Sequence, residues 1–198
     1  MRILMRASQT PFDNCTPLDS IAFNKIWSNV GNLLFPFSLI RNILSEDVTV
    51  DVCSSWLPQS DADYINENYD VLLIPLANAF RPSFINQLQK WTALIKKVTI
   101  PCVVAGVGAQ CGLDFSSQTK FEFDNDVKEF CSAVASKSAC IGVRGELTYK
   151  YLERLGFGSV TRIIGCPSMF MFGPDLPVPK QKTNTRGGGK NVDKHQKW

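Results

Sequence analysis

Residues 70–105 read DVLLIPLANAFRPSFINQLQKWTALIKKVTIPCVVA, and they contain one complete strand–helix–strand unit. Two short and continuously apolar runs, 70–74 and 101–105, have the composition of strands that are buried on both faces. Between them, Pro82 opens a segment whose apolar residues recur at helical spacing. These residues are Phe84, Ile85, Leu88, Trp91, Leu94 and Ile95. Two strands joined by a helix of this length favour a right-handed crossover and a parallel sheet.

The same alternation continues on both sides of this unit. We expect further strands at 2–5, 48–53, 139–143 and 160–164, and further helices at 32–44, 121–136 and 146–155. The last of these helices ends at Gly156, a typical C-terminal stop. The sequence thus predicts the α/β class with a doubly wound, mostly parallel, Rossmann-like sheet. After 164 the alternation ends in a segment that contains Pro167, Pro174, Pro177 and Pro179.

Charge and composition divide the chain into a body, 1–178, and a basic tail, 179–198. The formal net charge is +3, but the tail holds six basic residues and one acidic residue, so the body is slightly negative. The tail is rich in Gly and Lys and poor in apolar residues, so we expect it to be disordered. A body without basic character gives no reason to expect nucleic-acid binding.

Membrane and metal functions find little support. No apolar run approaches the roughly 20 residues of a membrane span, and the first six residues do not resemble a signal peptide, so we expect a cytoplasmic protein. The seven cysteines include no Cys-x-x-Cys pair and read as reduced thiols, and the single histidine, His195, lies in the tail. We therefore expect no metal site and no cofactor. No nucleophile motif is present either.

Ligands of open α/β sheets bind beyond the carboxyl ends of the strands, so the loops there are the candidate sites. The loop before the first long helix offers Asn29, Gly31 and Asn32, either as an anion-binding helix start or as an ordinary cap formed by Asn32. The loop after 74 offers Asn78 and Arg81, with a solvated Arg81 as the alternative.

Two later loops complete the candidate set. Gly106, Gly108 and Gln110 follow the strand at 101–105, but a dinucleotide fingerprint would need a third glycine at position 111, so a nicotinamide site is not expected. Arg144 and Glu146 stand between the strand at 139–143 and the next helix. Arg144 offers a fork of donors to a carboxylate or phosphate, unless it pairs with Glu146 and only braces the loop.

These loops resemble the polysaccharide pyruvyl transferase family. The segments that carry the resemblance are 73–82, 100–110, 141–146 and 163–170, whose order and spacing also fit, and the likeness covers about 29–178. The resemblance implies one half of a GT-B-like pair of Rossmann-type domains. It also implies transfer of the pyruvyl group of phosphoenolpyruvate to a sugar of a surface or exopolysaccharide as a cyclic ketal.

The resemblance makes phosphoenolpyruvate and a saccharide acceptor the expected partners, with Arg144 or Arg81 binding the acid groups. Because members of the family are longer, we expect the chain to be truncated and to lack the donor-binding half. Self-association or a missing C-terminal domain would complete it, and activity of this chain alone stays open. The alternatives are a non-catalytic saccharide- or protein-binding module, or half of a nucleotide-sugar glycosyltransferase.

Overall fold

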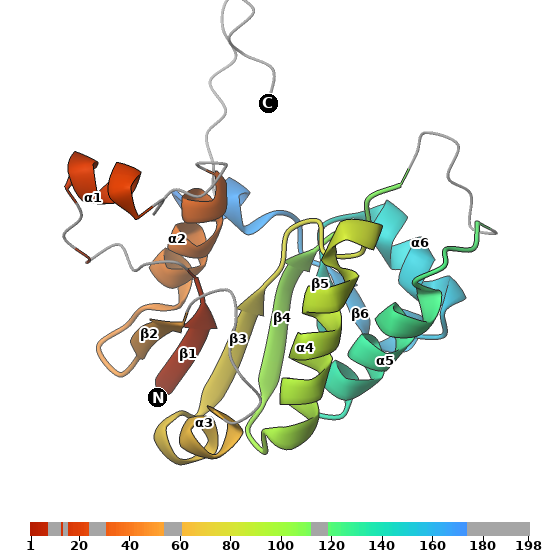
Figure 1. Ribbon diagram of the computed structural model, residues 1–198, viewed down its shortest axis with the longest axis horizontal. Helices are drawn as coiled ribbons and strands as arrows, with labels where there is room; N and C mark the ends of the chain where they lie inside the picture. Colours follow the sequence, from red (N-terminus) through yellow and green to blue (C-terminus); the bar gives the residue numbers. More distant parts are fainter. Residues whose placement is uncertain (8–12, 14–15, 24–30, 54–60, 112–118, 174–198) are drawn as a thin grey trace, which may run out of the picture.

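The computed structural model describes residues 1–7, 13, 16–23, 31–53, 61–111 and 119–173. Six parallel strands form one sheet in the order β2-β1-β3-β4-β5-β6, which confirms the predicted Rossmann-like α/β class (Figure 1). The strands are β1 (Arg2–Arg6), β2 (Thr49–Cys53), β3 (Val71–Pro75), β4 (Cys102–Val107), β5 (Ile141–Val143) and β6 (Thr161–Ile163). The chain winds outward in both directions from β1 and β3, so their carboxyl ends form the switch point where such sheets bind ligands.

Helices connect the strands, and most of them lie close to the predicted positions. The α-helices are α1 (Pro17–Ala22), α2 (Gly31–Ile43), α3 (Ala62–Asn68), α4 (Ile85–Lys97), α5 (Asp124–Ala135) and α6 (Glu146–Arg154). The 3-10 turns are η2 (Pro82–Phe84), η3 (Gly158–Val160) and η4 (Pro167–Phe170). Gly156 has φ +97°, as the predicted stop after α6 requires.

The sequence analysis missed α1 and α3. In α3 only Ala62 and Ile65 are buried, so the segment carries too little apolar periodicity to be recognised. In α1 no residue is buried, and the helix lies apart from the sheet (Figure 1). Local capping forms it instead: Thr16 and Asp19 make a capping box around Pro17.

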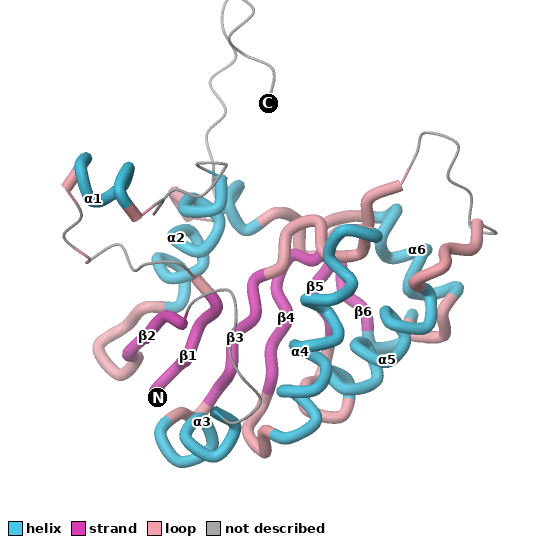
Figure 2. The backbone as a smooth tube through the Cα atoms, viewed as in Figure 1, coloured by secondary structure: helices cyan, strands magenta, loops and turns pink. Residues whose placement is uncertain are grey.

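The two faces of the sheet carry different cores. The larger core packs α3, α4, α5 and α6 against one face of the sheet (Figure 2). Its largest fully buried side chains include Phe80, Trp91, Phe130 and Tyr151. The smaller core lies on the other face, where Ile40 of α2 meets Met5 and Leu73. Loops surround the carboxyl ends of the central strands, and the candidate site lies among these loops.

Candidate functional site

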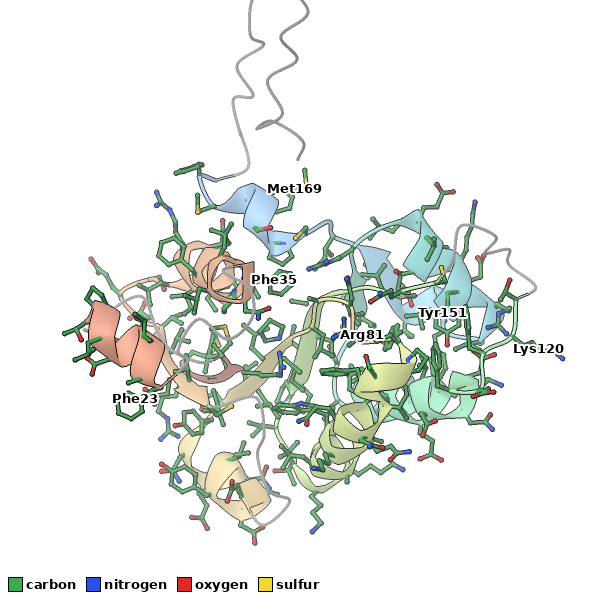
Figure 3. The ribbon with its side chains drawn as sticks, turned by 45° about the horizontal axis from the view of Figure 1, so that its top comes forward. Phe23, Phe35, Arg81, Lys120, Tyr151 and Met169 are labelled. Carbon is green, nitrogen blue, oxygen red and sulfur yellow. The ribbon has the colours of Figure 1, made fainter. Side chains whose placement is uncertain are left out.

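A cavity of about 500 Å³ opens at the carboxyl ends of β1 and β3. Its volume falls within the roughly 300–1,000 Å³ typical of small-molecule sites. In Figure 3, Phe35 on α2 and Arg81 on the loop after β3 lie beside the ends of the central strands. The lining residues that the argument uses are Arg6, Phe35, Asn78, Phe84, Arg81 and Arg144.

Arg144 follows β5 directly and is held on three sides. Its backbone N–H donates to the Val107 carbonyl over 3.0 Å, and its Nη1 donates to Oδ1 of Asn78 over 3.1 Å. The guanidinium carbon lies 5.1 Å from the centre of the Phe35 ring. The buried Nε has no hydrogen-bond partner. An amide and an aromatic ring orient this cation, but neither neutralises its charge.

Arg81 occupies a loop that is paired with its neighbour. The backbone N–H of Phe80 donates to the Gly108 carbonyl over 3.2 Å, and that of Gln110 donates to the Phe80 carbonyl over 3.0 Å. This pairing brings Arg81 Nη1 to 3.3 Å from Oε1 of Gln110, while the buried Nε of Arg81 has no partner. The loops after β3 and β4 therefore act as one platform that fixes the Arg81 side chain.

Arg6 also lines the cavity, and the sequence analysis missed it. It ends β1, its Nη1 donates to the Pro75 carbonyl over 3.1 Å, and its guanidinium carbon lies 5.9 Å from the Phe84 ring centre. Burial lowers the pKa of the Arg6 guanidinium from its usual value, and its Nε has no partner. The available signal was a charged residue at the carboxyl end of the apolar run Ile3–Leu4–Met5.

Every charged side chain among the described residues that line the cavity is positive. Among the described residues, the cavity wall holds three arginines and no aspartate or glutamate. Within the part of the chain that the structure describes, the partners of the three guanidinium groups are neutral: a carbonyl, a side-chain amide or an aromatic ring. A partly desolvated cluster of like charges is unfavourable on its own and becomes favourable when an anion enters. The geometry therefore fits a carboxylate- or phosphate-bearing ligand.

Of the other predicted site residues, some line the cavity and some do not. Gly31 and Asn32 line the cavity, but α2 begins at Gly31, so Asn32 lies in the first turn and the prediction that it caps the helix is wrong. Asn29 lies outside the described residues. Asn78 lines the cavity and accepts from Arg144, whereas Gln110 reaches the site only through Arg81.

Glu146 does not brace Arg144. Its Oε1 lies 2.8 Å from Nζ of Lys150 one helical turn later, and its side chain is 71% exposed and outside the cavity lining. The i, i+4 spacing of an acid and a base was visible in the sequence and explains the pairing. Glu146 therefore supplies no counter-charge to Arg144.

Gly106 inside β4 and Gly108 directly after it both allow close packing of the backbone. Gly106 has φ +69°, and a Cβ there would lie 2.7 Å from Cδ of Pro167 and 2.8 Å from Cζ of Phe35. Gly108 donates its N–H to the Ala77 carbonyl over 2.6 Å, and a Cβ there would lie 3.4 Å from Cδ of Arg144. Both glycines let the chain pass close behind the site, and neither lines the cavity.

Fold and cavity together define a Rossmann-like α/β protein with an arginine-lined site at its switch point. The chain belongs to the polysaccharide pyruvyl transferase family, because the family model of that name matches residues 11–197. Neither the curated proteins nor the solved structures gave a match. The family match is longer than the stretch over which the loops carried the resemblance, and it includes most of the predicted tail.

None of the helices within the described residues has the length and apolar composition that crossing a membrane requires. Within the same ranges, no three His, Cys, Asp or Glu side chains are grouped so that they could hold a metal ion. Six of the cysteines are free thiols within the described residues, and Cys53, Cys102 and Cys131 among them are buried.

Proposed function

We propose that this chain binds phosphoenolpyruvate and a saccharide acceptor in the arginine-lined cavity and takes part in pyruvyl transfer between them. The observation that carries the proposal is a single cavity with three arginines and no acidic lining residue among those described. Membership of the pyruvyl transferase family supplies the reaction class. The arginines support donor binding within this domain, whereas the sequence alone favoured a donor site in a missing half.

The proposed reaction places specific demands on the site. Two sugar hydroxyls form C–O bonds to the enol carbon of phosphoenolpyruvate, and the bond from that carbon to the phosphate oxygen breaks. One hydroxyl proton ends on the methylene carbon, which becomes the ketal methyl group, and the other ends on the leaving phosphate. Negative charge accumulates on that phosphate, and positive charge develops on the enol carbon. Fixed cations near the phosphate lower the barrier, because they need no reorganisation.

Arg144 and Arg81 are the proposed donor ligands. Phosphoenolpyruvate carries a carboxylate and a phosphate, and a guanidinium binds either group with two parallel hydrogen bonds. Phe35 removes water from one face of Arg144, and Asn78 and Gln110 fix the orientation of the two side chains. The described lining holds no carboxyl or imidazole group, so the proposal assigns binding and charge stabilisation to these residues and leaves the proton donor unassigned.

The test is phosphate release from phosphoenolpyruvate with β-linked galactose, mannose and N-acetylmannosamine acceptors. We expect release that requires an acceptor and that falls about a hundredfold or more in Arg144→Ala. Arg162→Ala is the matched control, because Arg162 donates to the carbonyls of Ser159 and Thr161 and is not among the described residues that line the cavity. Acceptor binding without any release, in a folded protein, would favour a saccharide-binding module instead.

A further inference from the structure

Arg6 and Arg144 reach the cavity from opposite faces of the sheet. Arg6 lies against Phe84, which packs on the core that holds α4, whereas Arg144 lies against Phe35 of α2, on the other side. Their strands, β1 and β5, are three positions apart in the sheet. At about 4.8 Å per position, the two backbones are separated by at least roughly 14 Å. The two arginines therefore enter the cavity from two sides, and their Nη1 atoms donate to Pro75 and Asn78 at and just after the end of β3.

One phosphoenolpyruvate leaves part of this cavity unfilled. The donor has about ten non-hydrogen atoms, fewer than the drug-sized ligands that fill sites of this volume. A donor bound by Arg144 and Arg81 lies over the loops after β3 and β4. The end at β1 then remains for the second substrate, and Arg6 is the charged group there.

Arg6 has an unsatisfied hydrogen-bond donor and no counter-charge among the described residues, as expected of a group that binds an anionic ligand. Its Nη1 donates a hydrogen bond to one backbone carbonyl, and its buried Nε has no acceptor. No ion pair within the described residues includes it, whereas Arg154, whose Nε also lacks a partner, donates through both Nη atoms to the carboxylate of Asp124. Withdrawing a guanidinium from water without a counter-charge costs free energy, and an anionic ligand offsets that cost.

We propose that Arg6 binds an acid group of the acceptor, so that the acceptor is an acidic saccharide. The shared chemistry is a carboxylate or a phosphate, from a uronic acid or from a sugar phosphate. This inference rests on the proposed function, since it assigns the second substrate of the same site. A guanidinium bound bidentately to such a group also orients the sugar, because the fork fixes direction as well as distance.

Calorimetric titration of the full chain tests the inference. The saccharide probes are glucuronic acid, its neutral methyl ester, glucose 1-phosphate and glucose. We expect one or both of the acidic sugars to bind at least about tenfold more tightly than glucose and the ester. This comparison uses the unmutated protein and so does not depend on the folding of a variant. Equal affinity for acidic and neutral sugars would overturn the inference.

Variants then locate the acidic group. Arg6→Gln is expected to weaken the favoured acidic sugar about tenfold or more, and Arg2→Gln, at the opposite end of β1, is the matched control. Phosphoenolpyruvate is titrated in parallel into each protein. If Arg6→Gln instead weakens phosphoenolpyruvate and spares the sugar, Arg6 belongs to the donor and the inference is wrong. If the unmutated chain binds acidic sugars through Arg6 but not phosphoenolpyruvate, the inference survives and the proposed function fails.

Discussion

Arg154 and Arg144 both lie over an aromatic ring and differ in the group that accepts their hydrogen bonds. Each guanidinium lies over an aromatic ring, Arg154 at 5.2 Å from Tyr151 and Arg144 at 5.1 Å from Phe35. Arg154 also donates to both carboxylate oxygens of Asp124, over 2.9 and 3.0 Å. Arg144 instead meets the neutral side-chain oxygen of Asn78. At Arg154 the anion is Asp124 of the same chain. At Arg144 we propose that the anion is the substrate.

The largest expected effect comes from removing the anion that the chain supplies. Asp124→Ala deletes the acceptor for Arg154 and for the Tyr151 hydroxyl, which donates to it over 2.9 Å. The pair is only 15–18% exposed, so we expect a loss of about 2–3 kcal/mol in the free energy of unfolding. Urea unfolding measures it. Arg144→Ala is the comparison and should change stability by less than about 1 kcal/mol, since no partner anion is left behind.

A smaller loss is expected behind the cavity. Gly106→Ala places a methyl group 2.7–2.8 Å from Pro167 and Phe35 at a residue with φ +69°, so we expect a loss of about 2 kcal/mol. Gly156→Ala is the control, because φ is +97° but nothing lies within 4 Å of its Cβ. The difference between the two variants isolates the steric contact. Equal losses would mean that Gly106 is required only for its backbone conformation.

The pH dependence of stability sharpens the comparison at Asp124. Desolvation by burial acts to raise the pKa of this carboxyl, but hydrogen bonds from Arg154 and Tyr151 outweigh it and hold the pKa below its usual value. The resulting stability is present above the unfolded pKa of about 4 and is lost as the pH falls through the lower folded value. Unfolding between pH 6 and 3 should therefore lose less stability in Asp124→Asn than in the unmutated chain. Parallel acid dependence in both proteins would contradict this assignment.

The smallest expected effect is a difference in the rate of cysteine labelling between the core thiols and the thiol at the cavity. Burial raises the pKa of the Cys53 and Cys102 thiols to about 12, and burial raises the pKa of Cys131 as well. Cys166 lines the cavity and is only partly buried. Mass-spectrometric mapping of iodoacetamide labelling should show Cys166 modified about tenfold faster than the three core thiols. Comparable rates would mean that the core opens as easily as the cavity.

The sheet could be predicted from the sequence, because its central strands are continuous apolar runs separated by strongly periodic helices. The run 71–75 and the periodic segment 85–97 leave little choice of structure. Helices α1 and α3 could not be found in the same way, since one is formed by its cap and the other buries only two residues.

The site could be predicted only in part. Arg144 directly follows β5, and Asn78 and Arg81 lie in the loop after β3, so the general rule for parallel sheets places them at one edge. Arg6 joins them only because β1 lies beside β3, and its partner Pro75 is 69 residues away. Whether an acid neutralises a particular arginine also depends on tertiary packing. Glu146 pairs with Lys150 and not with Arg144, whereas Asp124 pairs with Arg154, which is 30 residues away in the sequence.

The central claim is that Arg144 and Arg81 bind the anionic donor, and a calorimetric titration of phosphoenolpyruvate tests it most directly. The account predicts binding to the unmutated chain, binding at least about tenfold weaker in Arg144→Gln, and unchanged binding in Arg162→Gln. Equal affinities in all three proteins, or no binding to the folded unmutated chain, would contradict it.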